Sequence, residues 1–478
     1  MFKEQRVILP ITMDSLPESP AKTALGSLFA FWDKRNGIIG DSTHRGAKKN
    51  NAQKAFLKSL REGIIAVING LQNLTPAEQA MVFQVQHRKG WIFLAFAAKY
   101  AEDPDILEQL FTLLEKQSAA VQKQIFMVQD ECNWTFPMQA VSAIEDSSIL
   151  KRFFVLLQKQ SIATQERVLL TQNDGGWIFP MYVRCIEDFG VLEQFFALLE
   201  RQNAATQEQV FTIQEKDNWT FPMFVVGSIE DSNILTRFFA LLKKQSVATQ
   251  ELVLSMQNNG GWIFPMYVAE DIGDFGVLEQ FFALLKNQSA AMREYVFTLQ
   301  NKDGLTFPMQ VVMYIGDSNI LEQFFTLLEN QSAATQERIF TTQDKDGWIF
   351  PMLVARYVED SGILKRFFTL LKNQNAAVQE QVFTIRDKDG WTFPMQVVSA
   401  IEDLSVLEQF FALLKTQSVA TQERVFTEQN SGGWIFPMHV ARYIEDPNIL
   451  EQFSALLEKQ SAAVRKYISR VSNQDTDD

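Results

Sequence analysis

The sequence is poor in the residues that build disulfides, metal centres and membrane spans. Among its 478 residues are 2 cysteines and 3 histidines. Two cysteines in so long a chain give no disulfide framework, which favours a reducing compartment. Three histidines cannot assemble a histidine-rich metal site. No run approaches the ~18 consecutive apolar residues of a transmembrane helix, and Pro10 breaks the short N-terminal apolar stretch. We therefore expect neither a membrane span nor a secretory signal, and a cytoplasmic location.

Motifs for catalysis are also missing. The sequence contains no G-x-x-x-x-G-K-[ST], no H-E-x-x-H and no G-x-S-x-G. Acidic pairs such as Glu402-Asp403 are neighbours at a predicted helix end, where they cannot converge on one reacting atom as an acid–base pair must. We predict no enzyme, no cofactor and no metal site. The charge, 44 − 57 = −13, argues against nucleic acid and anionic membranes as partners.

What the sequence has in excess is phenylalanine, with 40 residues, and a repeated string, W-[IT]-F-P-M. Copies recur every 43 residues, except for one spacing of 42, where a residue is missing between Met181 and Ile186. Ile and Thr alternate after the first residue, which indicates growth by duplication of a pair of units. The copies begin at residues 91 (a partial copy), 134, 177, 219, 262, 305, 348, 391 and 434.

Each unit is predicted to form three helices, with the first residue of the string counted as offset 0. Proline at offset 3, as in Pro308, suits the first turn of a helix because its missing N–H is harmless there. The following I-L-x-x-F-F-x-L-L has a wide apolar stripe and predicts a nearly surrounded second helix. Ser332 and its equivalents stand where an N-cap would start the third helix. Glycine or asparagine before offset 0 predicts a turn with positive φ.

These patterns predict an all-α fold, a right-handed superhelical α-solenoid of about nine 43-residue three-helix repeats over residues 91–476. Residues 53–90 fit the second half of a unit and are predicted to be an N-terminal capping half-repeat. Residues 1–52 have little periodicity and are predicted to be an irregular leader. The chain is thus interpreted as one solenoid rather than several domains.

The stretch KDGLTFPMQVVMYIGDSNILEQFFTLLENQSA, Lys302 to Ala333, resembles an ankyrin repeat. The resemblance rests on Asp303, Gly304, Thr306, Gly316, Asp317 and the pair Leu327-Leu328. The proline lies one residue late, the usual histidine is absent, and the unit is about ten residues longer than the ~33 of an ankyrin repeat. The extra length falls in the third helix, which makes the unit similar to HEAT or armadillo repeats of ~40–47 residues. Long runs of such units also resemble effectors that intracellular bacteria deliver into host cells, which implies the host cytosol and a host protein as partner.

Positions that vary between otherwise near-identical units indicate the working face. Core positions must be similar in every unit because units pack on one another, whereas offsets 5, 8 and 9 of the first helix vary. At 100° per residue these offsets share one arc of about 100°, opposite the apolar stripe. We predict that this arc is exposed and binds the partner. Its candidate residues are Phe96, Lys99, Tyr100, Gln139, Tyr182, Arg184, Phe224, Tyr267, Glu270, Asp271, Gln310, Tyr314, Arg356, Tyr357, Gln396, His439, Arg442 and Tyr443.

Tyrosine and arginine, which dominate this face, are enriched at interface hot spots. Lys99, Arg184, Arg356 and Arg442 against Glu270 and Asp271 give 4 − 2 = +2, which favours a partner with some acidic character. The predicted function is therefore a non-catalytic protein–protein interaction scaffold or adaptor.

The alternative is an RNA-binding solenoid of pumilio-like logic, in which successive repeats present side chains to successive bases. Such a protein would need a continuous basic stripe on the variable face. The Trp and Phe of the repeated string are predicted to be inter-repeat core rather than a platform for bases. Glutamines at offsets 26, 31 and 38 are predicted to form amide ladders between units.

Overall fold

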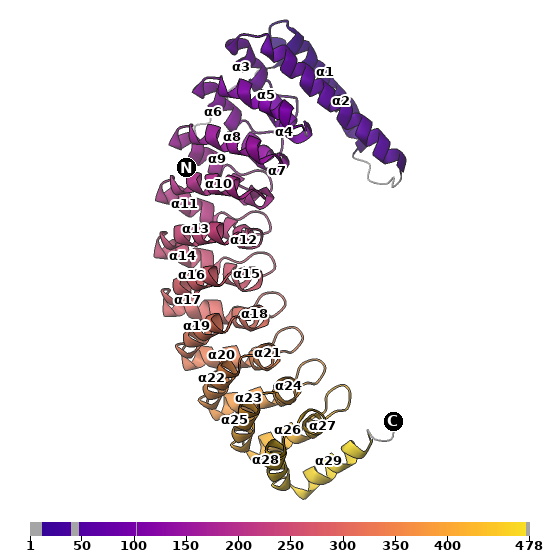
Figure 1. Cartoon of the computed structure of the whole chain (residues 1–478), viewed down its shortest axis with the longest axis vertical. Helices are drawn as coiled ribbons and strands as arrows, with labels where there is room; N and C mark the ends of the chain where they lie inside the picture. The colour runs from indigo at the N-terminus through magenta and orange to yellow at the C-terminus, as the bar shows by residue number, and fades with distance from the viewer. Residues whose placement is uncertain (1–11, 40–46, 102, 475–478) are drawn as a thin grey trace. The chain divides into compact units, whose positions relative to one another are not determined.

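The computed structural model describes residues 12–39, 47–101 and 103–474 (Figure 1). Within those residues every element is an α-helix or a 3-10 helix, and extended backbone pairs only at isolated bridges. Helices follow one another in a repeating order and contact their neighbours, so the molecule is a helical repeat-like solenoid, as predicted. The chain divides into two compact units, Met1–Leu241 and Leu242–Asp478.

The first unit begins with two long helices that pack against each other and continues with repeats of three shorter helices. The elements are η1 (Met13–Ser15), α1 (Pro20–Ile39), α2 (Ala47–Gln72), α3 (Pro76–Gln84), α4 (Phe93–Tyr100), α5 (Pro104–Glu115), α6 (Ala119–Met127), α7 (Phe136–Ala143), α8 (Ser147–Gln158), α9 (Ile162–Leu170), η2 (Phe179–Cys185), α10 (Phe189–Glu200), α11 (Ala204–Thr212), α12 (Phe221–Val226) and α13 (Ser232–Lys243), the last reaching the boundary.

Helix α1 differs from the predicted irregular leader. Ala21, Leu25, Leu28 and Phe29 lie at i, i+4, i+7 and i+8, and this stripe is buried. Helix α2 runs through the predicted boundary at residue 52/53. The rest of the leader, residues 1–11 and 40–46, lies outside the described residues.

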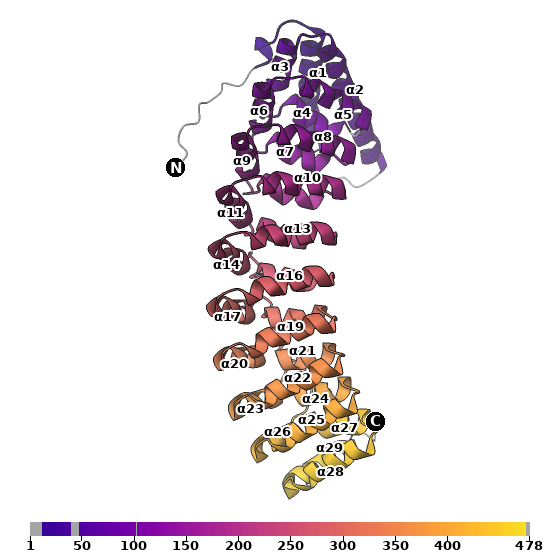
Figure 2. The same cartoon turned by 60° about the vertical axis from the view of Figure 1, so that its left-hand side comes forward.

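The second unit consists of the same three-helix repeats. Its elements are α14 (Val247–Ser255), α15 (Phe264–Asp271), α16 (Phe275–Lys286), α17 (Ala290–Thr298), α18 (Phe307–Tyr314), α19 (Ser318–Glu329), α20 (Ala333–Thr341), α21 (Phe350–Tyr357), α22 (Ser361–Lys372), α23 (Ala376–Thr384), α24 (Phe393–Ala400), α25 (Leu404–Lys415), α26 (Val419–Thr427), α27 (Phe436–Tyr443), α28 (Pro447–Glu458) and α29 (Ala462–Gln474). Within this unit the first helices α15, α18, α21, α24 and α27 form one row, and the connecting loops project beyond them (Figure 1). The third helices α17, α20, α23 and α26 form a separate row (Figure 2).

The predicted helix signals of each unit are confirmed in the repeat that starts at residue 305. Pro308 lies in the first turn of α18. The Asp317 side chain caps α19, and the Ser332 Oγ accepts the Thr335 N–H at 3.1 Å to cap α20. Gly304 has φ +80°, a left-handed conformation that costs glycine little. Local sequence therefore fixes where each helix begins and where each repeat ends.

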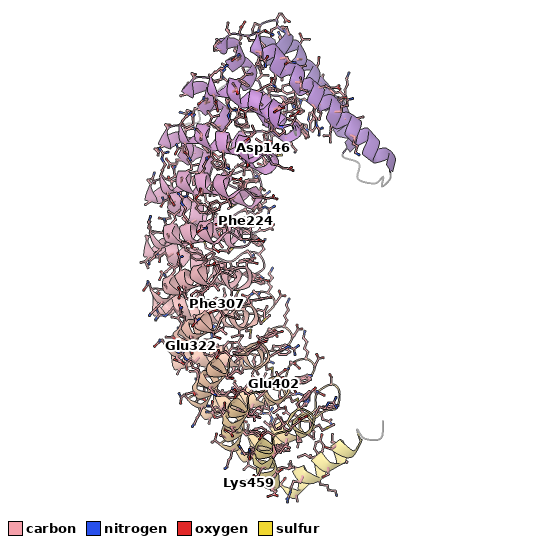
Figure 3. The ribbon with its side chains drawn as sticks, viewed as in Figure 1. Asp146, Phe224, Phe307, Glu322, Glu402 and Lys459 are labelled. Carbon is pink, nitrogen blue, oxygen red and sulfur yellow. The ribbon has the colours of Figure 1, made fainter. Side chains whose placement is uncertain are left out.

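Phenylalanine forms the core between repeats. Phe324 is fully buried on α19. Its ring centroid lies 5.8 Å from that of Phe297 in the preceding repeat, 6.3 Å from Phe307 in its own, and 6.2 Å from Phe350 in the next. Phe307 lies inside the stack of the second unit (Figure 3). One side chain thus joins three repeats, which explains why this position is apolar in every repeat, phenylalanine in most and Leu110 in the first.

The predicted amide ladder is confirmed between several repeats for the glutamines at offsets 26 and 31, whereas several of those at offset 38, such as Gln343, donate to backbone carbonyls instead. Gln374 Nε2 donates to Gln336 Oε1 at 2.9 Å, and Gln417 Nε2 donates to Gln379 Oε1 at 2.9 Å. The ladder is interrupted where Arg293 replaces the accepting glutamine, because a guanidinium has no acceptor. Arg293 donates instead to backbone carbonyls of its own repeat, Gln288 and Lys286.

The repeat with the missing residue adapts its first helix. Where the other repeats have an α-helix, Phe179–Cys185 forms the 3-10 helix η2. A 3-10 helix rises about 2.0 Å per residue against 1.5 Å in an α-helix. Seven residues therefore cover at least the length of the eight-residue first helices of most other repeats; η2 still packs on the first helices α7 and α12, and the following helix α10 still packs on α8.

Candidate functional site

Each repeat ends in a hairpin loop that is held by one polar side chain four residues before offset 0. In the loop 343–349, Asp344 Oδ1 accepts the N–H groups of Asp346 and Trp348, both at 2.8 Å. Neighbouring loops are joined through their backbones: the Lys345 N–H donates to the Asp303 carbonyl at 2.8 Å, and the Lys388 N–H to the Asp346 carbonyl at 2.8 Å. The loops of the second unit therefore form a continuous hydrogen-bonded edge beside the first helices.

The predicted variable face is exposed only at offsets 8 and 9. The tyrosines there are the most open: Tyr314, Tyr357 and Tyr443 are 47%, 44% and 51% exposed. The other predicted residues at these two offsets are exposed, apart from the half-buried Tyr100; they are Lys99, Arg184, Glu270, Asp271, Arg356 and Arg442.

The prediction that offset 5 belongs to the same exposed face is wrong. All eight predicted residues at this offset are buried, namely Phe96, Gln139, Tyr182, Phe224, Tyr267, Gln310, Gln396 and His439. Offset 5 is on the same side of the helix as offsets 8 and 9, as predicted. It lies in the first turn, however, where the Trp side chains of the repeated string cover it. The Trp rings are only partly buried, but they pack against offset-5 rings of the next repeat, as in Trp134–Tyr182 and Trp391–His439, which agrees with their predicted place between repeats.

Where offset 5 is aromatic, its ring fills the space beside the Trp side chains. In the first unit, Tyr182 lies between Trp134 and Trp177, with ring centroids 5.0 and 5.4 Å away. In the second unit, Tyr267 lies 5.2 Å from Trp262, and its hydroxyl is 2.7 Å from the Asn258 Nδ2. We call such repeats closed.

His439 closes a further repeat. Its ring centroid lies 4.6 Å from that of Trp391 and 5.4 Å from that of Trp434. Asn430 Oδ1 accepts two backbone N–H groups, so its Nδ2 points at His439 Nε2 and donates at 3.4 Å. Nε2 is then the acceptor, and the Nδ1 proton is directed to the Ser399 hydroxyl at 3.2 Å. Burial lowers the pKa of His439 to about 4, so the ring is neutral at pH 7.

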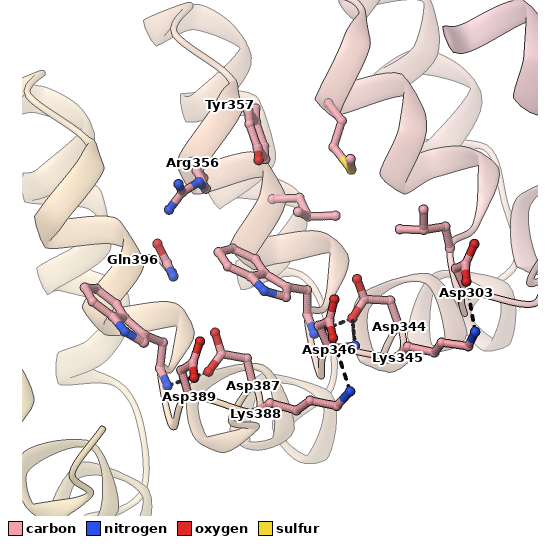
Figure 4. A pocket seen from close by; sticks show the side chains of 15 residues that line it. Asp303, Asp344, Lys345, Asp346, Arg356, Tyr357, Asp387, Lys388, Asp389 and Gln396 are labelled. Atoms are coloured by element: carbon pink, nitrogen blue, oxygen red, sulfur yellow. Dashed lines mark hydrogen bonds and ion pairs between the residues drawn. The ribbon is translucent and has the colours of Figure 1, made fainter. Parts of the chain in front are cut away.

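Three successive repeats of the second unit have no aromatic residue at offset 5. They carry Gln310, Leu353 and Gln396 there, and the first of them also has Leu305 in place of the Trp. We call these repeats open. A groove of about 660 Å³ lies over them (Figure 4). It is lined by Asp303, Leu305, Met313, Asp344, Lys345, Asp346, Trp348, Leu353, Arg356, Tyr357, Asp387, Lys388, Asp389, Trp391 and Gln396.

Charge in the groove is predominantly acidic. Five aspartates face three cations there, a sum of −2. The two lysines are engaged: Lys345 Nζ lies 2.9 Å from Asp303 Oδ1, and Lys388 Nζ lies 3.1 Å from Asp346 Oδ1. The remaining three carboxylates have no ion-pair partner among the described residues; they belong to Asp344, Asp387 and Asp389. Burial raises the pKa of Asp344 and of Asp387, against the lowering effect of the backbone N–H groups that they accept.

Gln396 and Arg356 complete the groove. Gln396 is 4% exposed as a residue, and its amide, which makes no hydrogen bond to any described part of the chain, is not fully buried, unlike that of Gln310. By contrast, Gln139 at the same offset donates to Asp130 Oδ2 at 3.0 Å. The Arg356 guanidinium carbon lies 5.5 Å from the centre of the Trp348 ring. Figure 4 shows Gln396 between Arg356 and the carboxylates of Asp387 and Asp389.

In the described ranges, no group of three or more His, Cys, Asp or Glu side chains is placed to hold a metal ion. No described helix is both long and apolar enough to cross a bilayer. Comparison of the sequence with models of known protein families finds no match, and comparison with curated proteins finds none either.

The sequence reasoning identified Arg356, Tyr357 and Gln396 as candidates, and the structure brings them together in one groove. It missed the loop carboxylates, although the change from Asn to Asp four residues before offset 0, at Asp344 and Asp387, was visible in the sequence.

Proposed function

We propose that this protein is a non-catalytic scaffold or adaptor that binds a partner protein through offsets 8 and 9 of its first helices and the adjacent hairpin loops. The observation that carries the proposal is the groove over the open repeats, with Tyr314, Arg356 and Tyr357 exposed beside it. Solenoids commonly bind partners on such extended surfaces. Exposed tyrosine and arginine on a rigid helical support are typical of interface hot spots.

We also propose the finer architecture that the repeats imply. It is a superhelical solenoid of about nine ankyrin-like, 43-residue units over residues 91–476, preceded by a cap over residues 53–90. The resemblance to effectors of intracellular bacteria supports action in a host cytosol on a host protein.

The RNA-binding alternative has less support. Phosphate contacts require basic side chains along the binding surface, and the groove places five aspartates against three cations. RNA binding is therefore kept as an outcome of the test rather than as a second proposal.

The test removes two side chains from the proposed surface. An Arg356→Ala, Tyr357→Ala variant should weaken a protein partner captured from a eukaryotic lysate by ~2 kcal/mol or more, measured with the purified partner. The matched control is Arg338→Ala, Tyr295→Ala. It removes the same residue types from the third helices α20 and α17, which contribute nothing to the groove.

The scaffold proposal predicts that the control retains full affinity and that both variants keep their helical circular dichroism signal. Equal loss in the two variants would contradict it. So would submicromolar binding of single-stranded RNA at physiological salt, with a steep salt dependence, and no captured protein.

A further inference from the structure

We infer that the groove over the open repeats binds the guanidinium group of an arginine side chain in a basic segment of the partner protein. This inference deepens the proposed function and rests on it. The sequence had favoured a partner with some acidic character, because the variable face sums to +2 along the whole chain. Within the groove the charge is negative instead, so this part of the surface favours a basic segment of the partner.

The groove contains negative charge that no cation of the described chain pairs. Asp387 is only 7% exposed, and its Oδ1 accepts the Trp391 N–H at 2.7 Å. A buried carboxylate without a cationic partner is costly, and a cation that enters the groove relieves that cost. Asp389, two residues further along the same loop, is exposed at the rim. The two carboxylates therefore provide an inner and an outer contact for one positive group.

The Gln396 amide also lacks a hydrogen-bond partner within the described chain. Its N and O atoms, unlike those of Gln310, are not sealed off from solvent, so a ligand in the groove can reach them. Gln396 lines the groove, and its carbonyl can accept an N–H from a ligand. A guanidinium carries five N–H donors in one plane, enough for the amide and a carboxylate together. An ammonium offers three donors from a single point and matches this arrangement less well.

The missing aromatic ring leaves space for a flat cation. In the closed repeat that follows, His439 packs beside Trp391 and Trp434. At the equivalent place beside Trp348 and Trp391 stands Gln396, which has no ring, with Arg356 over the Trp348 face. Flat cations stack on indole faces, and the chain itself shows this twice: Arg356 lies over Trp348, and Arg184 lies over Trp177 at 4.9 Å in the first unit. The Trp side chains of these repeats are therefore suitable partners for a guanidinium.

The experiment uses the full chain and three labelled peptides that alternate glycine with arginine, lysine or glutamate, in fluorescence anisotropy at low salt. The arginine peptide should bind more tightly than the lysine peptide, and the glutamate peptide should not bind. The test variant is Asp387→Asn, Gln396→Tyr, which rebuilds the Asn258–Tyr267 pair of a closed repeat and therefore preserves a side-chain combination that the fold already accommodates. It should lose at least about tenfold in affinity for the arginine peptide.

The matched control is Glu337→Gln on α20, an exposed carboxylate outside the groove. It should bind the arginine peptide as the wild type does, which would show that net charge alone does not explain the loss. Equal binding of the arginine and lysine peptides would overturn the guanidinium assignment. Unchanged binding by the Asp387→Asn, Gln396→Tyr variant would overturn the site.

Failure of this inference is separable from failure of the scaffold proposal. If a captured protein depends on Arg356 and Tyr357 while the arginine peptide does not bind, the scaffold stands and the arginine site is wrong. If the arginine peptide binds in the groove but the captured protein is insensitive to Arg356 and Tyr357, the site stands and the proposed surface for that partner is wrong.

Discussion

The closed and open repeats of the second unit share a backbone plan but present different surfaces. In the closed repeats, Tyr267 and His439 fill the first turn of α15 and α27 and pack on Trp side chains. In the open repeats between them, Gln310, Leu353 and Gln396 occupy the same offset, and a groove lies above. The comparison teaches that a buried position can shape the outer surface. What varies at offset 5 is how the space beneath the loops is filled.

The first unit supports this reading with an isolated case. Gln139 also replaces an aromatic residue, but its neighbours along the chain carry Phe96 and Tyr182. Its amide bonds to Asp130. The hollow beside it leaves no room for a water molecule. One glutamine is therefore accommodated by a local hydrogen bond, whereas three successive repeats without an aromatic ring leave a groove.

The largest expected effect is the loss of a closing ring. Tyr267→Ala should cost about 3–5 kcal/mol, the range for truncating a buried aromatic side chain, because it removes the packing on Trp262 and leaves the Asn258 amide without its partner. Gln396→Ala should cost less than about 1 kcal/mol, since that amide has no partner to lose. Urea unfolding of the two variants measures the difference, and similar losses would mean that open and closed repeats are packed alike.

A second test uses acid. The pKa of His439 is lowered to about 4 from an ordinary value of 6.5. Between these two pH values the unfolded chain binds the proton and the folded chain does not. The contribution of His439 to the free energy of unfolding is therefore fully present above pH 6.5 and is lost as the pH falls toward 4. The loss should be about 3 kcal/mol in all. His439→Gln, a residue found at this offset in open repeats, should lack this component when wild type and variant are unfolded in urea from pH 7 to pH 4. Parallel stability profiles would show that the histidine is not buried as described.

The smallest expected effect is a gain. Gln310 is fully buried, and neither atom of its amide has a hydrogen-bond partner; nor does Asn301 Nδ2. Gln310→Tyr should recreate the pair seen between Asn258 and Tyr267 and stabilise the protein by about 1–2 kcal/mol, by removing an unsatisfied amide and adding an aromatic ring. Thermal melting measures the gain. Asn301→Ala added to Gln310→Tyr should reduce it, and a lower melting temperature in the single variant would show that the open repeat has no room for the ring.

Much of the local structure followed from the sequence. Helix caps at Asp317 and Ser332, the positive φ of Gly304 and the first-turn proline Pro308 depend on the residue itself and its nearest neighbours. The amide ladder was also predictable, because a fixed spacing between units places Gln336 opposite Gln374. The core residues could be predicted from the repetition, because every unit packs on its neighbours and core positions must therefore be similar in every unit.

The same reasoning failed at offset 5. A helical wheel gives the angle of a side chain about its own axis but not what the preceding segment lays over it, and here the Trp side chains cover the first turn. It also overlooked α1, whose apolar stripe has no repeat to reveal it.

The sequence by itself thus determined the helices, their caps, the spacing of the repeats and the exposed tyrosines and arginines at offsets 8 and 9. Only the tertiary structure decided that Gln396 is buried and unpartnered, that the carboxylates of Asp387 and Asp389 line one groove with it, and that the groove exists at all. The physical reason is that the groove forms only when three repeats pack together and their side chains leave the space between them unfilled. Whether the side chain at offset 5 finds a partner depends on how the loop residue nine positions earlier is held, as the pairs Asp130–Gln139 and Asn258–Tyr267 show.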